Sequence, residues 1–214
     1  KVFQIFFLLQ IPIMPFAQSL YTQGQGVKDI EGNKYPSIII HGQEWMQKNL
    51  AVSKYRNGDP ILTGLNDAQW DSTTTGAYAI YDDVESNNTT YGKLYNWYAV
   101  AGIYDAASAA NPALRKKLAP TGWHIPSEAE WTQLINCLGG ETIAGGKMKS
   151  TGTSLWLSPN TAATNESGFT GLPGGHRTTS DTHFSGIGKE GFWWSTSEYN
   201  TSLFSFAYIR ILRR

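Results

Sequence analysis

The sequence predicts an α+β protein with two helices, short antiparallel sheets and long irregular loops. Strand and turn signals near the start, two stretches of helical periodicity, and alternating strands near the end support this class. Before the last strands, residues 145–191 are rich in Gly, Ser and Thr. Regular structure should be scarce there, and single apolar side chains should fasten the loops to the core: Leu155, Trp156, Phe169 and Leu172.

The first 19 residues have the layout of a secretory signal peptide. Lys1 precedes an apolar run over residues 2–11, and the small residues Ala17 and Ser19 fit a cleavage site. The run is too short, and too interrupted by Pro and Gln, for a membrane span. We therefore expect export and one domain over residues 20–214, without a transmembrane span after cleavage. A buried N-terminal strand is the alternative.

The first part of the expected domain reads as a hairpin. Residues 27–30 and 35–40 are predicted strands joined by a Gly-Asn turn, and a second turn leads into a returning segment over residues 43–46. Residues 66–90 are polar and rich in Thr and Asn, which predicts a long surface loop.

Two segments have apolar residues at helical spacing. The first begins near Tyr91 and has Leu94, Trp97, Tyr98 and Ala101 on one face, and residues 105–117 then return to loop composition. The second follows a short strand over residues 123–125. Ser127 can cap this helix, Glu130 completes a capping box, and an apolar stripe follows: Trp131, Leu134, Ile135 and Leu138.

The C-terminal region reads as two strands, over residues 192–197 and 203–212, because apolar and polar residues alternate there. Trp193 and Trp194 are adjacent, so they should face opposite sides of their strand.

Composition limits the classes of function. Lys plus Arg and Asp plus Glu both number 17, so no excess of positive charge favours nucleic acid. Charged residues are only 16% of the chain, and the abundant Thr, Ser, Asn and aromatic residues are typical of an exported β-rich module. The single cysteine, Cys137, cannot form an intramolecular disulfide, and we interpret it as a small buried or half-buried filler.

The residues that carry catalysis or bind metals do not form a known pattern. His124 is interpreted as a structural hydrogen-bonding residue, and the spacing of His176 and His183 matches no zinc signature. Glu128 and Glu130 lie at a helix start, which favours ionised carboxylates rather than a general acid. We therefore predict no catalytic residues, no metal and no cofactor.

Five blocks in order carry a resemblance to a known family. They are Gly-Gln-Glu-Trp-Met-Gln-Lys-Asn-Leu (42–50), Tyr-Gly-Lys-Leu-Tyr-Asn-Trp (91–97), the Pro-Thr-Gly-Trp segment with its helix start (120–131), Leu-Pro-Gly-Gly-His-Arg (172–177) and Trp-Ser-Thr-Ser (194–197). Together they resemble the Fibrobacter succinogenes major paralogous domain family, from about residue 29 to the end. The resemblance implies exported, mostly bacterial proteins without established enzymatic activity. It also implies the C-type-lectin-like fold shared with formylglycine-generating enzymes.

The chain departs from the family pattern in two places. Ala119 stands where family members often have Cys, and members usually continue into a further strand. We therefore expect a fragment that lacks a closing strand, so that residues 203–212 form an unpaired edge. The tripeptides of calcium-dependent sugar-binding lectins and the cysteine pair of formylglycine-generating enzymes are missing.

The candidate binding residues come from the late part of the chain, which often forms the ligand face in lectin-like folds. The family pattern leaves Trp193 more exposed than Trp194, near Glu198 and Tyr199. The same resemblance adds His176, Arg177, Tyr208 and Arg210. The alternative is that the tryptophans are only core or loop anchors.

We interpret the chain as a secreted or cell-surface module that binds without catalysis, toward polysaccharide, another envelope component or a cell-surface protein. A structural, self-assembling surface paralogue and an uncharacterised hydrolase are the alternatives.

Overall fold

The computed structural model of the protein describes residues 21–178, 183–200 and 205–214. The predicted signal peptide over residues 1–19 lies outside the described residues. The helices are α1 (Asp67–Ser72), α2 (Glu85–Tyr91), α3 (Trp97–Ala101), α4 (Ala106–Ala110), α5 (Glu128–Cys137) and α6 (Glu141–Met148), with 3-10 turns at Tyr81–Asp83 and Pro112–Leu114. The strands are β1 (Tyr21–Gln23), β2 (Val27–Lys28), β3 (Lys34–Tyr35), β4 (Ser37–Ile40), β5 (Gln43–Met46), β6 (Tyr78–Ala79), β7 (Leu94–Tyr95), β8 (Gly174–Arg177), β9 (Phe184–Ile187), β10 (Glu190–Asn200) and β11 (Ser205–Arg213).

Two sheets form the ends of the described chain, which confirms the α+β class. The N-terminal sheet has the order β1-β4-β5 and the C-terminal sheet the order β11-β10-β8-β9, while β2–β3 and β6–β7 are two-stranded. The predicted hairpin is present as β2 and β3. The expectation of only antiparallel sheets was wrong, because β8 and β10 pair in parallel, with Gly175 opposite Gly191. A side chain at Gly191 would strike the carbonyl of Leu172, so this close pairing requires glycine.

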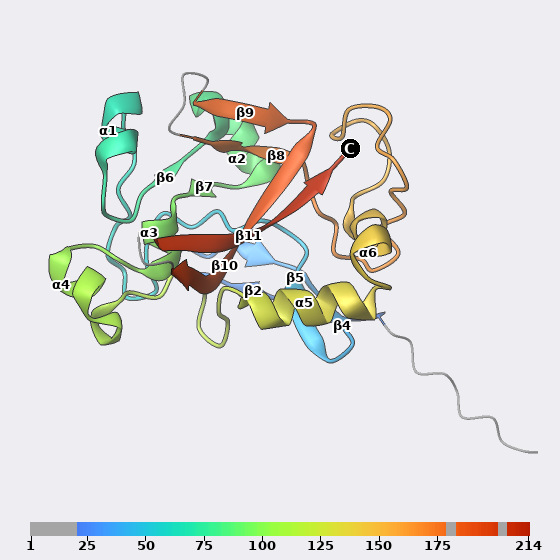
Figure 1. The fold of residues 1–214 in the computed structure, drawn as a ribbon, viewed down its shortest axis with the longest axis horizontal. Coiled ribbons are helices and arrows are strands. Elements are labelled where there is room, and N and C mark those ends of the chain that lie inside the picture. The colour runs from blue at the N-terminus through green and yellow to red at the C-terminus, as the bar shows by residue number, and fades with distance from the viewer. Residues whose placement is uncertain (1–20, 179–182, 201–204) are drawn as a thin grey trace, which may run out of the picture.

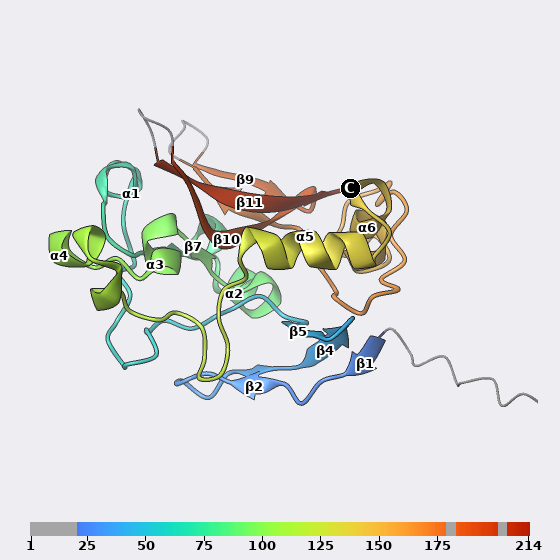
Figure 2. The same ribbon diagram turned by 60° about the horizontal axis from the view of Figure 1, so that its bottom comes forward.

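Helix α5 lies between the two sheets. Figure 1 shows α5 running beside β10 and β11, with α6 at its C-terminal end. Figure 2 shows the N-terminal strands on one side of α5 and the C-terminal strands on the other. Trp131 and Leu134 of α5 are buried in a core cluster with Ile38 and Trp45 of the N-terminal sheet and Leu212 of β11. The helix therefore joins the two sheets through one hydrophobic core.

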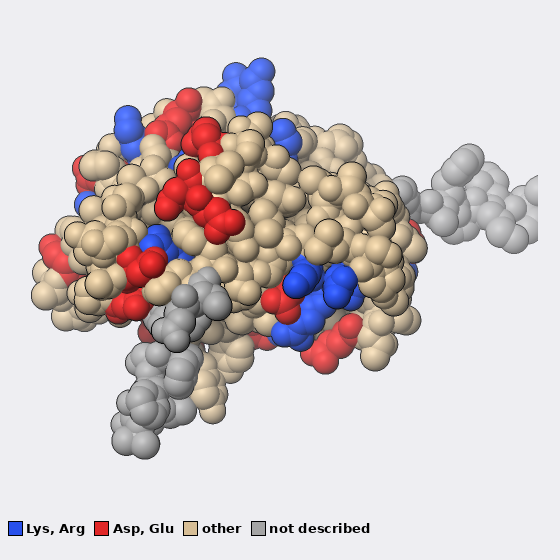
Figure 3. All heavy atoms as spheres, turned by 90° about the horizontal axis from the view of Figure 1, so that it is seen from above, with Lys and Arg blue, Asp and Glu red and all other residues tan. Residues whose placement is uncertain are grey.

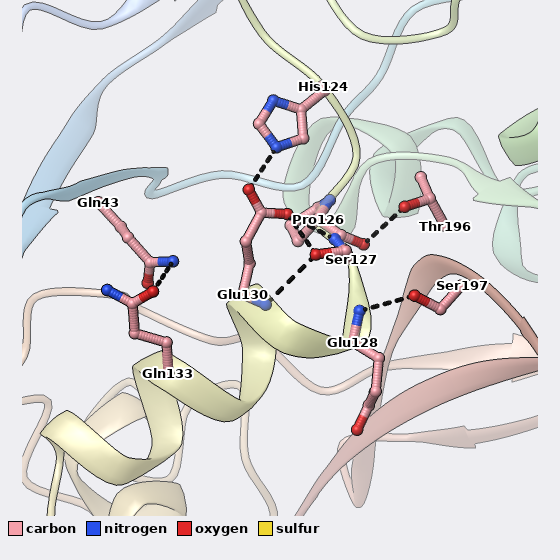
Figure 4. A network of polar contacts seen from close by, with 9 residues as sticks. All are labelled: Gln43, His124, Pro126, Ser127, Glu128, Glu130, Gln133, Thr196 and Ser197. Atoms are coloured by element: carbon pink, nitrogen blue, oxygen red, sulfur yellow. Dashed lines mark hydrogen bonds and ion pairs between the residues drawn. The ribbon is translucent and has the colours of Figure 1, made fainter.

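The predicted capping box of α5 is present (Figure 4). The Glu130 N–H donates to the Ser127 hydroxyl at 3.3 Å, and the Ser127 N–H donates to the Glu130 carboxylate at 2.7 Å. His124 contacts the same carboxylate at 2.8 Å, in line with its interpretation as a structural hydrogen-bonding residue. The cap also reaches the C-terminal sheet, because the Glu128 N–H donates to Ser197 at 3.1 Å.

The predicted strand over residues 123–125 is not formed. The carbonyl groups of this region are taken by the guanidinium of Arg56, which donates to Ala119 and Pro120 at 2.8 Å and to Trp123 at 2.7 Å. Residues 123–126 therefore form an irregular connection into α5.

The described chain has four helices more than the two expected, and all four are short. Residues 66–90 do not form a loop throughout, because Asn66 and Gln69 make a capping box for α1 and Trp70 buries its ring. The helix expected near Tyr91 begins only at Trp97, after the cap Asn96, since Leu94–Tyr95 pairs as a strand with Tyr78–Ala79.

Two of the four predicted anchors of the loop-rich stretch, Trp156 and Phe169, are buried, whereas Leu155 and Leu172 are half-buried. Trp156 is fully buried and its indole N–H donates to the Gly171 carbonyl at 3.1 Å, while Phe169 is 5% exposed. Lys149 is also buried, and its ammonium donates to the carbonyl groups of Thr161 and Arg213 at 2.7 and 2.9 Å. The ammonium group of Lys149 thus joins the loop to the end of β11.

Candidate functional site

The described chain encloses a cavity of about 530 Å³. It lies against residues 44–50, which comprise the end of β5 and the segment after it, and against residues 192–194 of β10. Ten of its lining residues are Trp, Tyr or Phe. Its volume falls within the roughly 300–1,000 Å³ usual for small-ligand sites.

All five sequence blocks that carry the family resemblance contribute to this lining. Residues 44–50, 91–95, 123–131, 172–177 and 194 reach the cavity from segments far apart in the sequence. The five blocks, although separate in the sequence, therefore line the same cavity in the folded chain.

Aromatic rings in tilted and edge-to-face contact form one wall of the cavity. Trp45 lies 4.8 Å from Trp131 and 6.1 Å from Phe169, measured between ring centroids, and Phe169 lies 5.9 Å from Trp193. Trp45, Trp131 and Phe169 are buried, so their packing fixes the wall as part of the main core.

Hydrogen bonds tie the segment after β5 to the opposite side of the cavity. The Trp193 indole N–H donates to the Asn49 side-chain oxygen at 3.0 Å, and the Asn49 amide donates to the Tyr91 carbonyl at 2.8 Å. The Gln47 amide donates to the Gly168 carbonyl at 2.9 Å. These contacts leave little freedom for the side chains between the two sheets.

Arg177 enters the cavity lining from β8. Its guanidinium lies over the rings of Trp70 and Phe184, at 4.5 and 4.9 Å from their centroids. The same group donates to the Asp67 carboxylate at 2.9 Å and to the Leu65 carbonyl at 3.0 Å. Its side chain is 4% exposed, so a cation is held at the cavity by two rings and one carboxylate.

His176 also lines the cavity, and its ring lies 4.4 Å from the Phe192 ring. Burial lowers the pKa of the imidazole below its ordinary value, while the Glu190 carboxylate acts in the opposite direction. The neutral imidazole is therefore the favoured form near neutral pH.

The seven predicted site residues separate into two groups. His176, Arg177 and Trp193 line the cavity, whereas the other four lie on the β10–β11 hairpin outside it: Glu198, Tyr199, Tyr208 and Arg210. A register shift between Trp194 and Glu198 separates the groups along β10. Trp193 and Trp194 pack against different core clusters, as their positions on opposite faces of β10 require. Both side chains are half-buried, so the expectation that Trp193 is clearly the more exposed of the two is not met.

The hairpin group is engaged in contacts of its own. Glu198 pairs with Arg115 at 3.0 Å, and Arg210 pairs with Glu128 of α5. The rings of Tyr199 and Tyr208 lie 5.8 Å apart, edge to face, and are 51% and 37% exposed. The two tyrosines are thus the accessible part of this group.

Sequence reasoning missed most of the aromatic lining. Trp45, Tyr91 and Trp123 were not proposed as site residues, although each falls in a block of the family resemblance. Their shared occurrence in those blocks was the signal that could have found them.

Within the described ranges, no three His, Cys, Asp or Glu side chains gather closely enough to hold a metal ion. Acidic and basic side chains on the face in Figure 3 occur in small separate groups. In the same part of the chain, every helix falls short of the length and apolarity needed to cross a bilayer.

A sequence profile of the Fibrobacter succinogenes major domain matches residues 38–210, which is most of the chain and includes every segment of the cavity lining. The chain belongs to this family. No curated protein and no solved structure is significantly similar to it. The cavity therefore lies within the Fibrobacter succinogenes major domain of this chain.

Proposed function

We propose that the chain is a non-catalytic binding module with the aromatic-lined cavity as its binding site. The observation that carries this proposal is the convergence of ten aromatic residues from separate segments on one cavity of about 530 Å³. Large apolar pockets with a few polar groups are the usual form of ligand sites. We further propose a C-type-lectin-like fold, supported by the position of α5 between two small sheets and by the long irregular stretch before β8.

The proposed ligand is a polysaccharide or another saccharide component of an envelope. Indole and phenol rings offer flat apolar faces with a polar edge, which suit the alternating C–H and hydroxyl surfaces of sugar rings. Trp123 and Tyr91 support this role, because both line the cavity, are half-buried and belong to none of the buried core clusters.

The proposal places this activity outside the cell or at its surface. Its support is the sequence of residues 1–19, which resembles a signal peptide. Expression of the full chain in a bacterial host, followed by fractionation and intact-mass measurement, tests this part. A processed chain that begins after Ala17 or Ser19 is expected, and an unprocessed cytoplasmic chain would contradict it.

Binding is tested with the purified chain on a panel of soluble glycans and cell-wall fragments. Trp123→Ala should lower affinity for any bound glycan roughly 5-fold to 100-fold, the range for losing one stacking side chain. Tyr199→Ala is the matched control, because it removes an exposed ring outside the cavity. If only Tyr199→Ala abolished binding, the binding site would lie on the β10–β11 hairpin and not in the cavity. If the chain bound no glycan of the panel, the saccharide proposal would be wrong.

Self-assembly is a second candidate function, favoured by the exposed edge of the C-terminal sheet. In the sheet that the described residues form, β11 is an edge strand, and its Tyr208 and Ile209 are 37% and 39% exposed. Such edges are templates for pairing with another chain. Sedimentation velocity should then show association that Tyr208→Lys abolishes, and a monomer at all concentrations would exclude this role.

A further inference from the structure

The polar groups that line the cavity differ in whether they already have partners. Lys93 donates to the Ala51 carbonyl at 2.5 Å and to Asn88 at 3.2 Å. Glu44 accepts from the Ser37 hydroxyl at 2.5 Å and from the Gln25 N–H at 3.1 Å. Both bonds to Glu44 use Oε1, so among the described residues this carboxylate keeps one oxygen, Oε2, without a hydrogen bond.

Three buried atoms of the lining have no partner among the described residues, and two of them are donors. The third, His176 Nδ1, donates or accepts according to its tautomer. Trp45 is 7% exposed, and its indole N–H has no acceptor among the described residues. The Nε–H of Arg177 is likewise buried and lacks a partner, although the rest of the guanidinium is engaged. Neither nitrogen can accept a hydrogen bond, and a buried donor without a partner is unfavourable. A ligand that fills the cavity would relieve this cost only if it supplied oxygen acceptors.

The charges of the lining have a positive balance. Lys48, Lys93 and Arg177 stand against Glu44 in the lining. Outside the lining, Asp67 pairs with Arg177, and the carboxylates of Glu31, Glu85 and Asp29 act on Lys93. Lys48 is exposed at the cavity and forms no ion pair within the described part of the chain. The positive charge of Lys48 therefore favours a negatively charged ligand.

We infer that the cavity takes an acidic saccharide, a sugar whose ring carries a carboxylate. This inference rests on the proposed saccharide-binding function and assigns its ligand class. The ring packs on the aromatic lining, while carboxylate and hydroxyl oxygens accept from Trp45, Arg177 and Lys48. Charge-assisted bonds of this kind are roughly twice as strong as neutral ones, so they discriminate against uncharged sugars.

The test compares oligogalacturonides with their methyl esters by isothermal titration calorimetry on the full chain. The two ligands share rings and hydroxyl groups and differ in charge. The acid should bind at least about tenfold more tightly, and the difference should shrink as salt rises from about 0.05 to 0.5 M. A neutral galactan of equal length is the second reference ligand.

Two variants test which side chains donate to the carboxylate of the ligand. Lys48→Gln should weaken the acid roughly twofold to fivefold without changing ester binding. Lys34→Gln is its control, since Lys34 is an exposed lysine of β3 outside the cavity. Trp45→Phe keeps a ring but removes the N–H, and should weaken the acid roughly tenfold. A thermal melt checks that Trp45→Phe is folded. If it is not, the comparison of Lys48→Gln with Lys34→Gln tests the proposal.

Equal binding of acid and ester would overturn the acidic ligand class and leave the saccharide-binding proposal standing. Tighter binding of the neutral galactan would do the same. If none of the three ligands binds, and the wider glycan panel also fails, both proposals are wrong.

Discussion

Strand β10 passes through two different environments, and their comparison shows how this domain separates stability from accessibility. Trp193 lies in the cavity wall, where it contacts Phe169 and Asn49 from distant segments. Tyr199 lies six residues further along, and its ring contact is with Tyr208 on the adjacent strand. The Trp193 ring is therefore held by buried contacts with distant segments, whereas the exposed Tyr199 ring contacts only the adjacent strand among the ring contacts of the described residues, so substitutions of the two rings should have different consequences.

The largest expected difference concerns the core behind the wall. Trp131→Ala should lower the free energy of unfolding by about 3–5 kcal/mol, because it removes a buried indole that packs on Trp45 and Phe169. Tyr199→Ala should change it by less than about 0.5 kcal/mol. Urea unfolding followed by tryptophan fluorescence measures both, and similar losses would remove the distinction between the two regions.

The next effect concerns the inner end of the hairpin. Lys149→Met should cost about 2–3 kcal/mol, since it removes the buried cationic donor of two partly buried hydrogen bonds, to the carbonyl groups of Thr161 and Arg213. The exposed Lys189 provides the control substitution, Lys189→Met, which should be nearly neutral. Hydrogen exchange should show faster opening of β11 only in the first variant, and unchanged protection would contradict this anchoring.

A smaller effect concerns the cap that links α5 to β10. Ser127→Ala should lower stability by about 1 kcal/mol, because the Glu130 N–H loses its acceptor. Ser154→Ala, at an exposed position in a loop, is the matched control. Equal midpoints for the two variants in chemical unfolding would show that the cap adds nothing.

The smallest expected effect is a dependence on pH at the cavity wall. The pKa of His176 is below its ordinary value of 6.5 because burial disfavours the charged imidazole. The unfolded chain therefore takes up this proton first as the pH falls, and the stability contributed by the neutral side chain is present above pH 6.5 and lost below it. Unfolding curves between pH 5 and about 8 should show a smaller pH dependence in His176→Gln than in the unchanged chain. Identical pH profiles would refute this role.

Local sequence signals predicted the parts of the fold that depend on local contacts. Ser127 and Glu130 mark the start of α5, and the alternation after Gly191 marks the last two strands. The capping box at Asn66 was a signal of the same kind, but its short helix buries only Trp70 and has no apolar periodicity to accompany it. Composition alone therefore made that region look like a loop.

The candidate site was less predictable, because its lining comes from segments that only the folded chain brings together. An aromatic residue in the sequence is equally compatible with the core and with a cavity wall, and Trp45 serves both. Of the residues that the family resemblance suggested, His176, Arg177 and Trp193 line one cavity. The resemblance could not reveal that the register shift in β10 and ion pairs with Arg115 and with Glu128 of α5 hold Glu198 and Arg210 outside the cavity.

The guanidinium of Arg56 has a consequence for how this domain can vary. Its planar fork meets three carbonyl groups on one irregular turn, and that turn carries Trp123 to the cavity. A lysine would keep the charge at this position but could not reproduce the fork. The orientation of one ring at the cavity is therefore set by a residue 67 positions earlier in the sequence, and an Arg56→Lys substitution, although it looks conservative, would loosen it.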